Sequence, residues 1–343
     1  MAGFSERLLR FWYSRSPFWP FIPLSLLFAT LVAWRRAAYR LGILKTAVLP
    51  APVIVVGNVT VGGTGKTPFV IWLAAALKDR GYAPGIITRG YGGSASIWPL
   101  SVGPESDPWE AGDEAVLLAR RAAVPVVAGP DRVAAARSLI EKSRVNVILS
   151  DDGLQHYRLP RVLEIQMLDG ERGLGNGWML PSGPLREPEQ RLRGAELVII
   201  KKTAAGRFTW PDAISMELFL DAAVAMADGR RLPLKKFAGQ PVHAVAAIGN
   251  PGQFFDSLTA AGLEVDSHAL PDHARLAAAD LTFFDRAPVF ITEKDSVKCQ
   301  GMTLSNHWYV PASACFTPAD ADRILTLVQR RLADAGVKSA NRT

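Results

Sequence analysis

A glycine-rich stretch, GNVTVGGTGKTP at residues 57–68, contains the residue types that bind nucleotide phosphates. An apolar run, PVIVVG, precedes it and a helical stretch, PFVIWLAAALKDR, follows it, which is the strand–turn–helix context that a phosphate loop requires. The backbone N–H groups of Gly62, Gly63, Thr64 and Gly65 can point at phosphate oxygens, and the following helix contributes the positive end of its dipole. This stretch therefore predicts a site for a nucleoside triphosphate.

The two residues that close the loop have specific roles in such a site. Lys66 can reach the β- and γ-phosphates, and the Thr67 hydroxyl can ligate Mg²⁺. The general pattern has a glycine five positions before Gly65, where this chain has Thr60. Glycines on both sides of Thr60 let the loop turn differently. The alternative is a glycine-rich loop that binds nothing, and Lys66-Thr67 in this context argues against it.

Two adjacent acids, Asp151 and Asp152, follow the apolar run VNVILS. Acids at the end of a strand beside a phosphate loop can hold Mg²⁺, directly or through water, and can orient Thr67 or a nucleophile. The alternative is an Asp-Gly turn that ends the strand and has no ligand. The phosphate loop favours the metal role, but the sequence leaves open which of the two carboxylates touches the metal.

Short apolar runs alternate with helical stretches after residue 50. The expected strands, rich in Val and Ile, are Pro52–Gly57, Gly85–Thr88, Pro125–Ala128, Val145–Ser150, Glu164–Leu168 and Glu196–Lys201. The expected helices are Pro68–Arg80, Asp113–Ala123 and Arg132–Lys142. Strands without polar alternation are typical of a sheet that is covered on both faces. The pattern therefore predicts a parallel, doubly wound α/β fold.

The remainder of the chain suggests a second unit. Residues 43–202 contain the phosphate loop and the strands given above. Residues 203–240 hold two possible strands around a turn at Asp228-Gly229, and we expect a hairpin or connector there. The strand-and-helix pattern begins again at Pro241, so residues 241–335 are expected to form a smaller α/β unit.

The N-terminal residues 1–42 differ from the rest. In FSERLLRFWYSR the apolar residues occur at helical spacing, and an uncharged run follows from Phe18 to Trp34. This run is at the short end of the roughly 20 residues that span a bilayer, and arginines flank it on both sides. We interpret residues 1–42 as a helical segment associated with the membrane surface. A buried core helix is the alternative, and Trp-Arg-Arg in place of a small-residue cleavage site argues against a signal peptide.

Composition is consistent with an anionic partner. The chain has 343 residues and a formal charge of +7, which favours phosphorylated substrates or an anionic bilayer. The basic residues are scattered rather than interleaved with aromatic residues, so we expect no nucleic-acid partner. Cys299 and Cys315 have no metal-ligand spacing and cannot form a disulfide framework.

Most of the remaining motifs follow the expected strands, where α/β sheets place ligand sites. They are RGYGG (Arg89–Gly93), AGDE (Ala111–Glu114), GPDR (Gly129–Arg132), DDGLQHYRL (Asp151–Leu159), LPSGPLRE (Leu180–Glu187), GNP (Gly249–Pro251), LPDH (Leu270–His273) and TEKD (Thr292–Asp295). In this order, and with GNVTVGGTGKTP, they make the chain resemble the tetraacyldisaccharide 4'-kinases, the lipid A 4'-kinases of Gram-negative bacteria. The resemblance extends from the N-terminal apolar segment to about residue 330, and Thr60 in the loop agrees with it.

The resemblance implies a fold and an activity. The family has two α/β domains of the P-loop NTPase type, joined by a β-hairpin. It transfers the γ-phosphate of ATP to the 4'-hydroxyl of a tetraacyl glucosamine disaccharide 1-phosphate, an alcohol acceptor, and gives lipid IVA in lipid A biosynthesis. It uses ATP and Mg²⁺ and works on the cytoplasmic face of the inner membrane. We expect this chain to be a monomer with a peripheral or N-terminal anchor.

The resemblance also implies roles for single residues. Lys66 and Thr67 keep their phosphate and Mg²⁺ roles, Asp151 and Asp152 form the acidic pair, and Glu187 is a further Mg²⁺ ligand. Arg186 is expected to stabilise phosphate charge. Asp113 and His273 correspond to the pair that activates the sugar hydroxyl, and which of them is the base stays open. If they meet, the active site lies between the two units. Arg89, Arg132 and Lys294 are possible anion contacts.

Two other functions share the same loop and sheet. A membrane-bound NTPase switch would hydrolyse the nucleotide without a glycolipid acceptor, so acceptor-dependent ADP formation separates it from a kinase. An ATP-dependent ligase would need a carboxylate substrate, and no feature of the sequence selects one.

Overall fold

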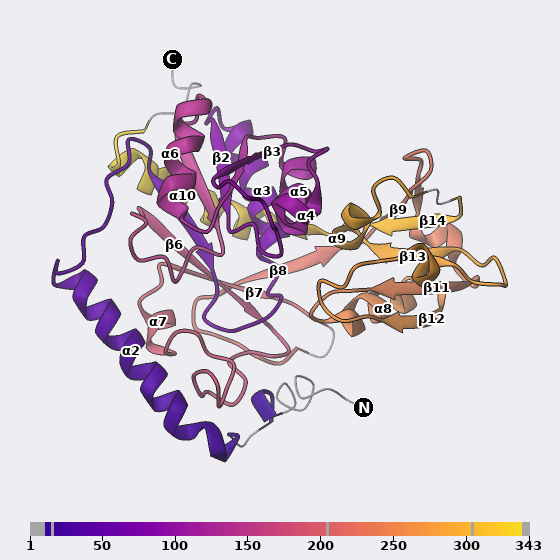
Figure 1. Ribbon diagram of the computed structural model, residues 1–343, viewed down its shortest axis with the longest axis horizontal. Coiled ribbons are helices and arrows are strands. Elements are labelled where there is room, and N and C mark those ends of the chain that lie inside the picture. The colour runs from indigo at the N-terminus through magenta and orange to yellow at the C-terminus, as the bar shows by residue number, and fades with distance from the viewer. Residues whose placement is uncertain (1–10, 15–16, 204–205, 303–304, 338–343) are drawn as a thin grey trace.

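The computed structural model describes residues 11–14, 17–203, 206–302 and 305–337, and these form two α/β units (Figure 1). The larger unit contains α2 (Ile22–Arg40), β1 (Val53–Gly57), α3 (Lys66–Asp79), β2 (Pro84–Thr88), β3 (Leu100–Val102), α4 (Pro108–Ala111), α5 (Asp113–Ala122), β4 (Val126–Ala128), α6 (Arg132–Lys142), β5 (Val147–Asp151), β6 (Leu163–Asp169), α7 (Gln190–Arg193), β7 (Leu197–Lys201), β8 (Ile214–Phe219), β15 (Ser313–Cys315) and α10 (Pro318–Asp334). The smaller unit contains β9 (Ala222–Ala225), β10 (Arg231–Pro233), β11 (Pro241–Ala246), α8 (Pro251–Ala260), β12 (Glu264–Ala269), β13 (Val289–Thr292), α9 (Glu293–Ser296) and β14 (His307–Val310). Short 3₁₀ turns are η1 (Trp19–Phe21), η2 (Leu234–Phe237), η3 (Ala278–Leu281) and η4 (Val297–Cys299).

The large sheet confirms the α/β prediction. Its strand order is β15-β8-β7-β6-β1-β5-β2-β4-β3, and the strands from β8 to β4 pair in parallel. The strands β15 and β3 pair antiparallel at the two edges. Side chains of α3, α5 and α10 pack on one face of this sheet, and those of α6 pack on the other. The Val- and Ile-rich central strands are buried because helices cover both faces.

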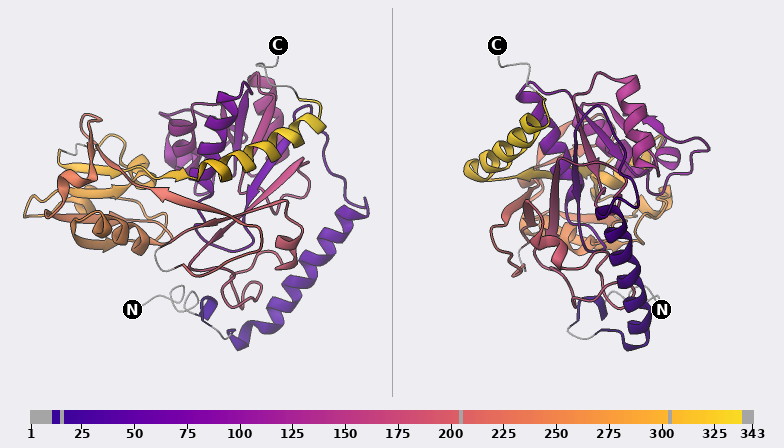
Figure 2. Two further views of the ribbon diagram at one scale, coloured as in Figure 1. Left: turned by 180° about the vertical axis from the view of Figure 1, so that it is seen from behind. Right: turned by 90° about the vertical axis from the view of Figure 1, so that its left-hand side faces the viewer.

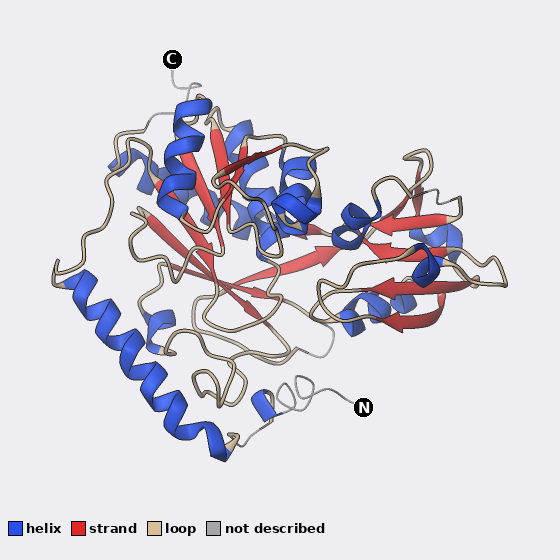
Figure 3. Cartoon of the chain, viewed as in Figure 1, coloured by secondary structure: helices blue, strands red, loops and turns tan. Residues whose placement is uncertain are grey.

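The small sheet has the order β10-β9-β14-β13-β11-β12. Its strands from β14 to β12 are parallel, while β9 is antiparallel to both β14 and β10. The sheet forms a separate lobe beside the large unit (Figure 3). The turn at Asp228-Gly229 lies between β9 and β10, which pair antiparallel within the small sheet and do not connect the two units.

The division between the units differs from the expected boundaries. β8 continues the large sheet and leads into β9 of the small sheet, and β15 returns to pair antiparallel with β8. Helix α10, which we expected in the smaller unit, packs its buried residues Ile324, Leu325, Val328 and Leu332 in the core of the large unit. Figure 2 shows this helix lying across the large sheet. Residues 203–240 therefore supply strands to both sheets, and the small unit is inserted between β8 and β15.

The N-terminal helix α2 lies along the outside of the large unit (Figure 1). Together with η1 it is long and apolar enough to cross a membrane. Only 11% of its most apolar 18-residue stretch is buried. Ser25 Oγ donates to the Met179 carbonyl at 2.6 Å, while Leu26, Leu27 and Leu31 are exposed. This exposure argues against the core-helix alternative. Most of the amphipathic pattern expected in residues 4–15 lies outside the described residues.

Candidate active site

The phosphate loop leaves the sheet at the end of β1 and continues into α3 at Lys66. Gly65, which precedes the helix, has a φ of +80°, and a Cβ on it would come within 2.7 Å of Met216 Cε. Glycine avoids both the backbone strain and this contact. Lys66 and Thr67 therefore occupy the N-terminal turn of a 14-residue helix, where N–H groups without helical partners attract anions.

Four polar side chains meet beside this loop. Lys66 Nζ donates to Asn58 Oδ1 at 2.9 Å and lies 3.4 Å from Asp152 Oδ1. Arg186 donates to the two carboxylate oxygens of Asp152 at 2.9 and 3.1 Å and also to Asn58 Oδ1. The structure thus brings together three residues expected in the site, Lys66, Asp152 and Arg186, and adds Asn58.

Thr60 helps to hold Arg186 in this network. It forms a β-bridge with Leu185, the Arg186 N–H donates to the Val59 carbonyl at 2.6 Å, and Arg186 Nε donates to the Thr60 carbonyl at 3.2 Å. The Thr60 side chain is buried. At the position where the general loop pattern has glycine, Thr60 therefore supports the arginine through its backbone.

The two adjacent acids have different environments. Burial, together with the charge of Glu114, raises the pKa of Asp151 to about 7. Burial acts on Asp152 as well, but Lys66 and Arg186 outweigh it and hold the pKa of this carboxyl well below its usual range. Asp152 is therefore ionised and paired, whereas Asp151 still binds a proton near neutral pH when no cation faces it.

Buried oxygen atoms without hydrogen-bond partners lie in this part of the site. Within the described part of the chain, Asp151 Oδ1 and Thr64 Oγ1 are two such atoms. Thr67 adds a hydroxyl from the first turn of α3. Mg²⁺ binds hard oxygen ligands of this kind, so the donor set fits the ion expected from the sequence.

Glu187 lies in a different environment from these donors. It is 1% exposed, its Oε1 accepts a hydrogen bond from the Tyr157 hydroxyl, and its Oε2 has no partner among the described residues. Burial raises the pKa of Glu187, although the Tyr157 hydrogen bond and the charges of Arg191 and Arg36 oppose this shift. Since Arg36 belongs to α2, Glu187 faces that helix while Arg186 faces the phosphate loop.

Arg132 of the GPDR motif is buried next to the acidic pair. Its Nη1 donates to the Gly129 carbonyl at 2.7 Å and its Nη2 donates to the Asp151 carbonyl at 3.4 Å. Its Nε is buried without a partner in the described structure. Burial lowers the pKa of Arg132 to about 10, so the guanidinium stays charged at neutral pH. The preceding Asp131 caps α6.

A second cluster forms where the start of α5 meets the loop after β12. Nδ1 of His273 lies 3.0 Å from Oδ2 of Asp113. Lys294 Nζ is 3.4 Å from Nε2 of His273, and Lys298 Nζ is 3.8 Å from Oδ2 of Asp113. Burial opposes ionisation of Asp113, but the His273 hydrogen bond and the two lysines outweigh it and lower its pKa. The pair expected from the sequence therefore meets across the two units.

The small unit fixes its side of this cluster through a buried carboxylate. Asp295 is fully buried and accepts hydrogen bonds from the Ala247 N–H at 2.9 Å and from the Thr292 hydroxyl at 2.7 Å. Lys298 Nζ donates to its other oxygen at 2.8 Å. The TEKD motif thus starts a short helix, with Thr292 as its cap, and also orients Lys294 and Lys298.

Glu114 connects the two clusters. It follows Asp113 at the start of α5, and its carboxylate accepts from Lys294 Nζ at 2.9 Å. Its charge also contributes to the raised pKa of Asp151. The Asp113–His273 pair and the acidic pair beside the phosphate loop are therefore neighbours.

The RGYGG loop closes one side of His273. The ring centroids of Tyr91 and His273 are 4.8 Å apart, and the Arg89 guanidinium lies 5.8 Å from the centre of the Tyr91 ring. This contact places the loop beside the Asp113–His273 pair. Burial acts to lower the pKa of Lys294, whereas the charges of Glu114 and Asp113 act to raise it. The charges prevail, so the pKa of Lys294 is raised.

Several residues of the site were not assigned from the sequence. Asn58 binds Lys66, and Lys201 Nζ lies 2.7 Å from Asp169 Oδ2 and 3.3 Å from the Gly63 carbonyl of the loop. These residues, like the acidic pair, lie at or directly after the carboxyl ends of strands in the parallel sheet, and that position was the available signal.

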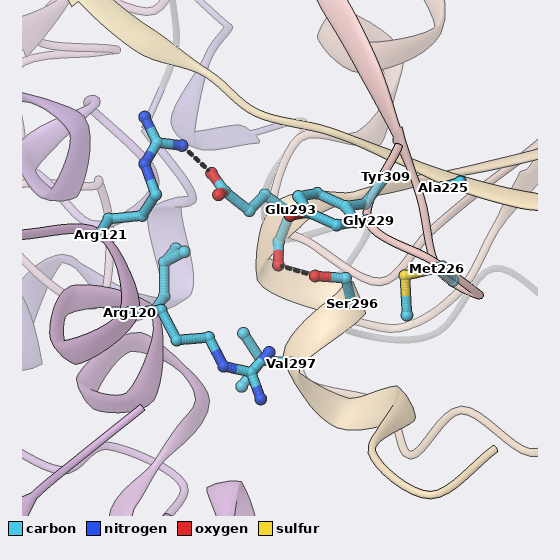
Figure 4. A pocket seen from close by; sticks show the side chains of 10 residues that line it. Arg120, Arg121, Ala225, Met226, Gly229, Glu293, Ser296, Val297 and Tyr309 are labelled. Carbon is cyan, nitrogen blue, oxygen red and sulfur yellow. Dashed lines mark hydrogen bonds and ion pairs between the residues drawn. The ribbon is translucent and has the colours of Figure 1, made fainter. Parts of the chain in front are cut away.

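A cavity of about 340 Å³ lies between the units, farther along α5 toward its C-terminal end. Figure 4 shows Arg121 of α5 pointing at Glu293 of α9, while Arg120 extends toward Val297. Arg121 Nη1 is 2.6 Å from the Glu293 carboxylate. This ion pair joins the two units at Glu293, the residue that precedes Lys294.

Comparisons with known proteins agree with this geometry. The family model described as Tetraacyldisaccharide-1-P 4'-kinase matches residues 18–330. The chain is 48% identical to a tetraacyldisaccharide 4'-kinase of Nitrosococcus oceani, with 96% of each chain covered. It is 43% identical to one of Pseudomonas aeruginosa, with 92% of this chain and 95% of the relative covered.

A solved structure supports the same conclusion. LpxK from Aquifex aeolicus in complex with ATP has a TM-score of 0.76 and 30% identity, and covers 91% of this chain and 98% of that chain. The two α/β units, the phosphate loop and the paired Asp113 and His273 thus occur in a chain that matches this family over nearly its full length. The chain belongs to the tetraacyldisaccharide-1-P 4'-kinase (LpxK) family.

Proposed function

We propose that this chain transfers the γ-phosphate of ATP to the 4'-hydroxyl of a tetraacyl glucosamine disaccharide 1-phosphate and forms lipid IVA. The observation that carries the proposal is the contact between His273 and Asp113 at 3.0 Å, next to a phosphate loop. An NTPase switch needs the loop but has no need for a proton acceptor contributed by a second unit.

His273 is the proposed proton acceptor, and Asp113 positions it. A carboxylate on Nδ1 fixes the proton at that nitrogen, so Nε2 carries the lone pair. The side chain of His273 is 24% exposed and that of Asp113 is 6% exposed, so the imidazole is the more accessible group. As the acceptor oxygen bonds to the γ-phosphorus and the bond to ADP breaks, the hydroxyl proton passes to Nε2.

Basic side chains neutralise the charge of the transferred phosphoryl group in this proposal. Lys66 and Arg186 are bound to Asn58 and Asp152 in the present structure, and both can exchange part of these contacts for phosphate oxygens. Arg132 adds a buried positive charge beside Asp151. Phosphoryl transfer depends mainly on such positioning and charge neutralisation.

Thr67 and Asp151 are the proposed Mg²⁺ ligands, with Asp152 in reach through water and Glu187 as a further candidate. When bound, the ion would neutralise the β- and γ-phosphates. The protein holds the donors in place through the pairing of β1 with β5, which ends at Asp151.

The exposed apolar side of α2 is the proposed contact with the membrane. Leu24, Leu26, Leu27, Leu31 and Trp34 are all more than half exposed, and Arg35 and Arg40 follow in the same helix. Apolar residues followed by basic ones suit the cytoplasmic leaflet of an anionic bilayer. We expect the protein to act there as a monomer.

The test is a transfer assay with γ-labelled ATP, Mg²⁺ and tetraacyl disaccharide 1-phosphate in detergent. We expect label on the lipid with the wild-type protein and near loss of it with Asp113→Ala. Asp228→Ala, in the β9–β10 turn, is the matched control and should transfer normally. ADP formed at the same rate without lipid, and no labelled lipid, would instead identify an NTPase switch.

A further inference from the structure

Three potential metal ligands converge on one face of the small sheet, outside the site described above. His243 lies on β11, and Asp266 and His268 lie on the edge strand β12. The two strands are parallel, and His243 is opposite Asp266. Residues two apart on a strand share a face, so His268 lies on the same side as Asp266.

The distances between the donor atoms match those around a single tetrahedral ion. Nδ1 of His243 is 3.1 Å from Nε2 of His268 and 3.2 Å from Oδ2 of Asp266. The His268 and Asp266 atoms are 3.4 Å apart. Zinc-to-ligand bonds of about 2.0–2.1 Å at tetrahedral angles place neighbouring donors about 3.3 Å apart.

The surroundings of His243 orient it for ligation. Its other nitrogen, Nε2, lies 3.0 and 3.1 Å from the two carboxylate oxygens of Asp285. Its ring stacks on Phe283 with centroids 3.7 Å apart and planes inclined by 13°. A carboxylate on the second nitrogen is the usual outer partner of a metal-binding histidine, because it fixes the tautomer and the ring plane.

The three donor atoms lie close enough to share one positively charged partner, either a proton or a metal ion. If Nε2 of His243 donates to Asp285, its Nδ1 has a lone pair and no proton. That lone pair faces the Asp266 carboxylate, which only accepts hydrogen bonds when ionised. His243 is 8% exposed, so its ring is largely shielded from water. An ion among the three donors would satisfy all of them.

We propose that His243, Asp266 and His268 bind one divalent transition-metal ion of the zinc class. Two imidazoles and one carboxylate suit zinc, and the hard oxygen donors of the phosphate loop suit Mg²⁺. The Asp266 side chain is 65% exposed, so water can take the fourth position. The ion joins the edge strand β12 to β11.

This site has a structural consequence for the active site. β12 ends at Ala269, directly before the loop that carries His273. An ion held by His268 would anchor the strand from which that loop starts. Among the described residues, the side-chain ion pairs and hydrogen bonds of the three ligands join them to one another and to Asp285, so the role of the ion is to stabilise the small unit.

The test uses the full chain, purified without a histidine tag and treated with a chelator. Co²⁺ is added in the presence of excess Mg²⁺, which occupies the oxygen site, and the visible absorption of tetrahedral Co²⁺ is recorded. Zn²⁺ then displaces Co²⁺, and the melting temperature is measured with and without Zn²⁺. We expect one equivalent of Co²⁺ with a tetrahedral spectrum, and a higher melting temperature with Zn²⁺.

Variants separate the proposed ligands from other histidines. His268→Gln and Asp266→Asn should abolish the spectrum and the thermal shift, and both positions are exposed enough for folding to be retained. Asp285→Asn keeps all three ligands and should weaken binding by about 10–100-fold, as expected for an outer partner. His307→Gln removes an imidazole that bonds the Leu281 carbonyl and should bind as the wild type does.

The result that overturns the proposal is equally specific. It would be the absence of stoichiometric Co²⁺ binding, or binding that persists unchanged in both His268→Gln and Asp266→Asn. A thermal shift with Zn²⁺ that also survives in these two variants would place the ion elsewhere. In either case the cluster would be a proton-sharing network only.

Discussion

The Nδ1 atom of His273 and the Oδ2 atom of Asp113 are 3.0 Å apart, although 160 residues separate them in the chain. One comes from the loop after β12 and the other from the start of α5. Their contact requires the small unit to be docked against the large one. Phosphoryl transfer should therefore depend on interactions that hold the units together as well as on the pair itself.

Substitution of either member of the pair should reduce kcat far more than the KM for ATP. We expect Asp113→Asn and His273→Gln each to lower kcat by about 10²–10⁴-fold, the usual contribution of a positioned proton acceptor. Because the two act as one unit, the double variant should be hardly worse than the poorer single variant. Steady-state kinetics with the glycolipid acceptor measures this, and fully additive losses would contradict the proposed pairing.

Binding of Mg²⁺ and nucleotide should release a proton from Asp151. Its pKa of about 7 means that the free carboxyl is largely protonated at pH 6.5, whereas a metal ligand must be ionised. Calorimetry in buffers of different ionisation enthalpy counts the released protons. The release should decline as pH rises toward 8.5. Asp151→Asn should lack this part of the release, and an identical release in the variant would exclude Asp151.

The same group should make the nucleotide-free protein less stable as pH rises. A folded-state pKa near 7, above the unfolded value of about 3.9, means that the folded state binds the proton more tightly. The free energy of unfolding should therefore fall between about pH 4 and pH 7. Asp151→Asn should gain up to about 4 kcal/mol at pH 8, since one pKa unit corresponds to about 1.4 kcal/mol. Urea unfolding at pH 5 and pH 8 tests whether the gain shrinks in acid.

Removal of the buried carboxylate of Asp295 should strongly destabilise the protein. Asp295→Ala removes the carboxylate that is hydrogen-bonded to the Lys298 ammonium, whose side chain is 2% exposed, and leaves only the more distant Asp113 as a charged partner. Breaking a buried ion pair in this way costs about 3–5 kcal/mol. The matched control is Glu217→Ala, which breaks an exposed ion pair with Lys202 and should cost less than about 1 kcal/mol. Chemical denaturation of both variants measures the difference, and equal losses would contradict this account.

Polar substitutions on α2 should release the protein from membranes. The triple change Leu26→Gln, Leu27→Gln and Leu31→Gln removes three exposed apolar side chains, each worth about 1.5–3 kcal/mol if buried in lipid. We expect at least a 100-fold loss of binding to anionic vesicles in a flotation assay, since about 1.4 kcal/mol is tenfold. Phe219→Gln, at an exposed position on β8, should have little effect. Unchanged flotation of the triple variant would exclude this face.

Local patterns predicted the central elements well. Helix α6 begins and ends at the expected residues, Arg132 and Lys142, and the expected parallel strands are present because continuous apolar runs are typical of covered sheets. The edge strand β3 was not predicted, since three residues carry no measurable alternation. The return of β15 and α10 was also missed, because an amphipathic helix fits the core of either unit equally well.

In the candidate site, too, residues within consecutive motifs were predicted, and residues brought together by the fold were not. The phosphate loop and the acidic pair were recognisable from consecutive residues, whereas Asn58 and Lys201 had only their positions near strand ends to mark them. Glu187 illustrates a different problem. It follows Arg186 directly, but alternate side chains of an extended segment point apart, and sequence order could not show which of the two faces the loop.

The pairing of β15 with β8 sets Ser313 opposite Phe219, so the chain leaves for the small unit and returns from it at neighbouring positions. A different domain inserted between β8 and β15 in place of the small unit would leave the strand order of the large sheet unchanged. The large unit contains the phosphate loop, and the inserted small unit contributes His273, Lys294 and Lys298 to the site. Because β8 and β15 carry the chain into and out of the small unit, a bend at this junction would change the distance between Asp113 and His273.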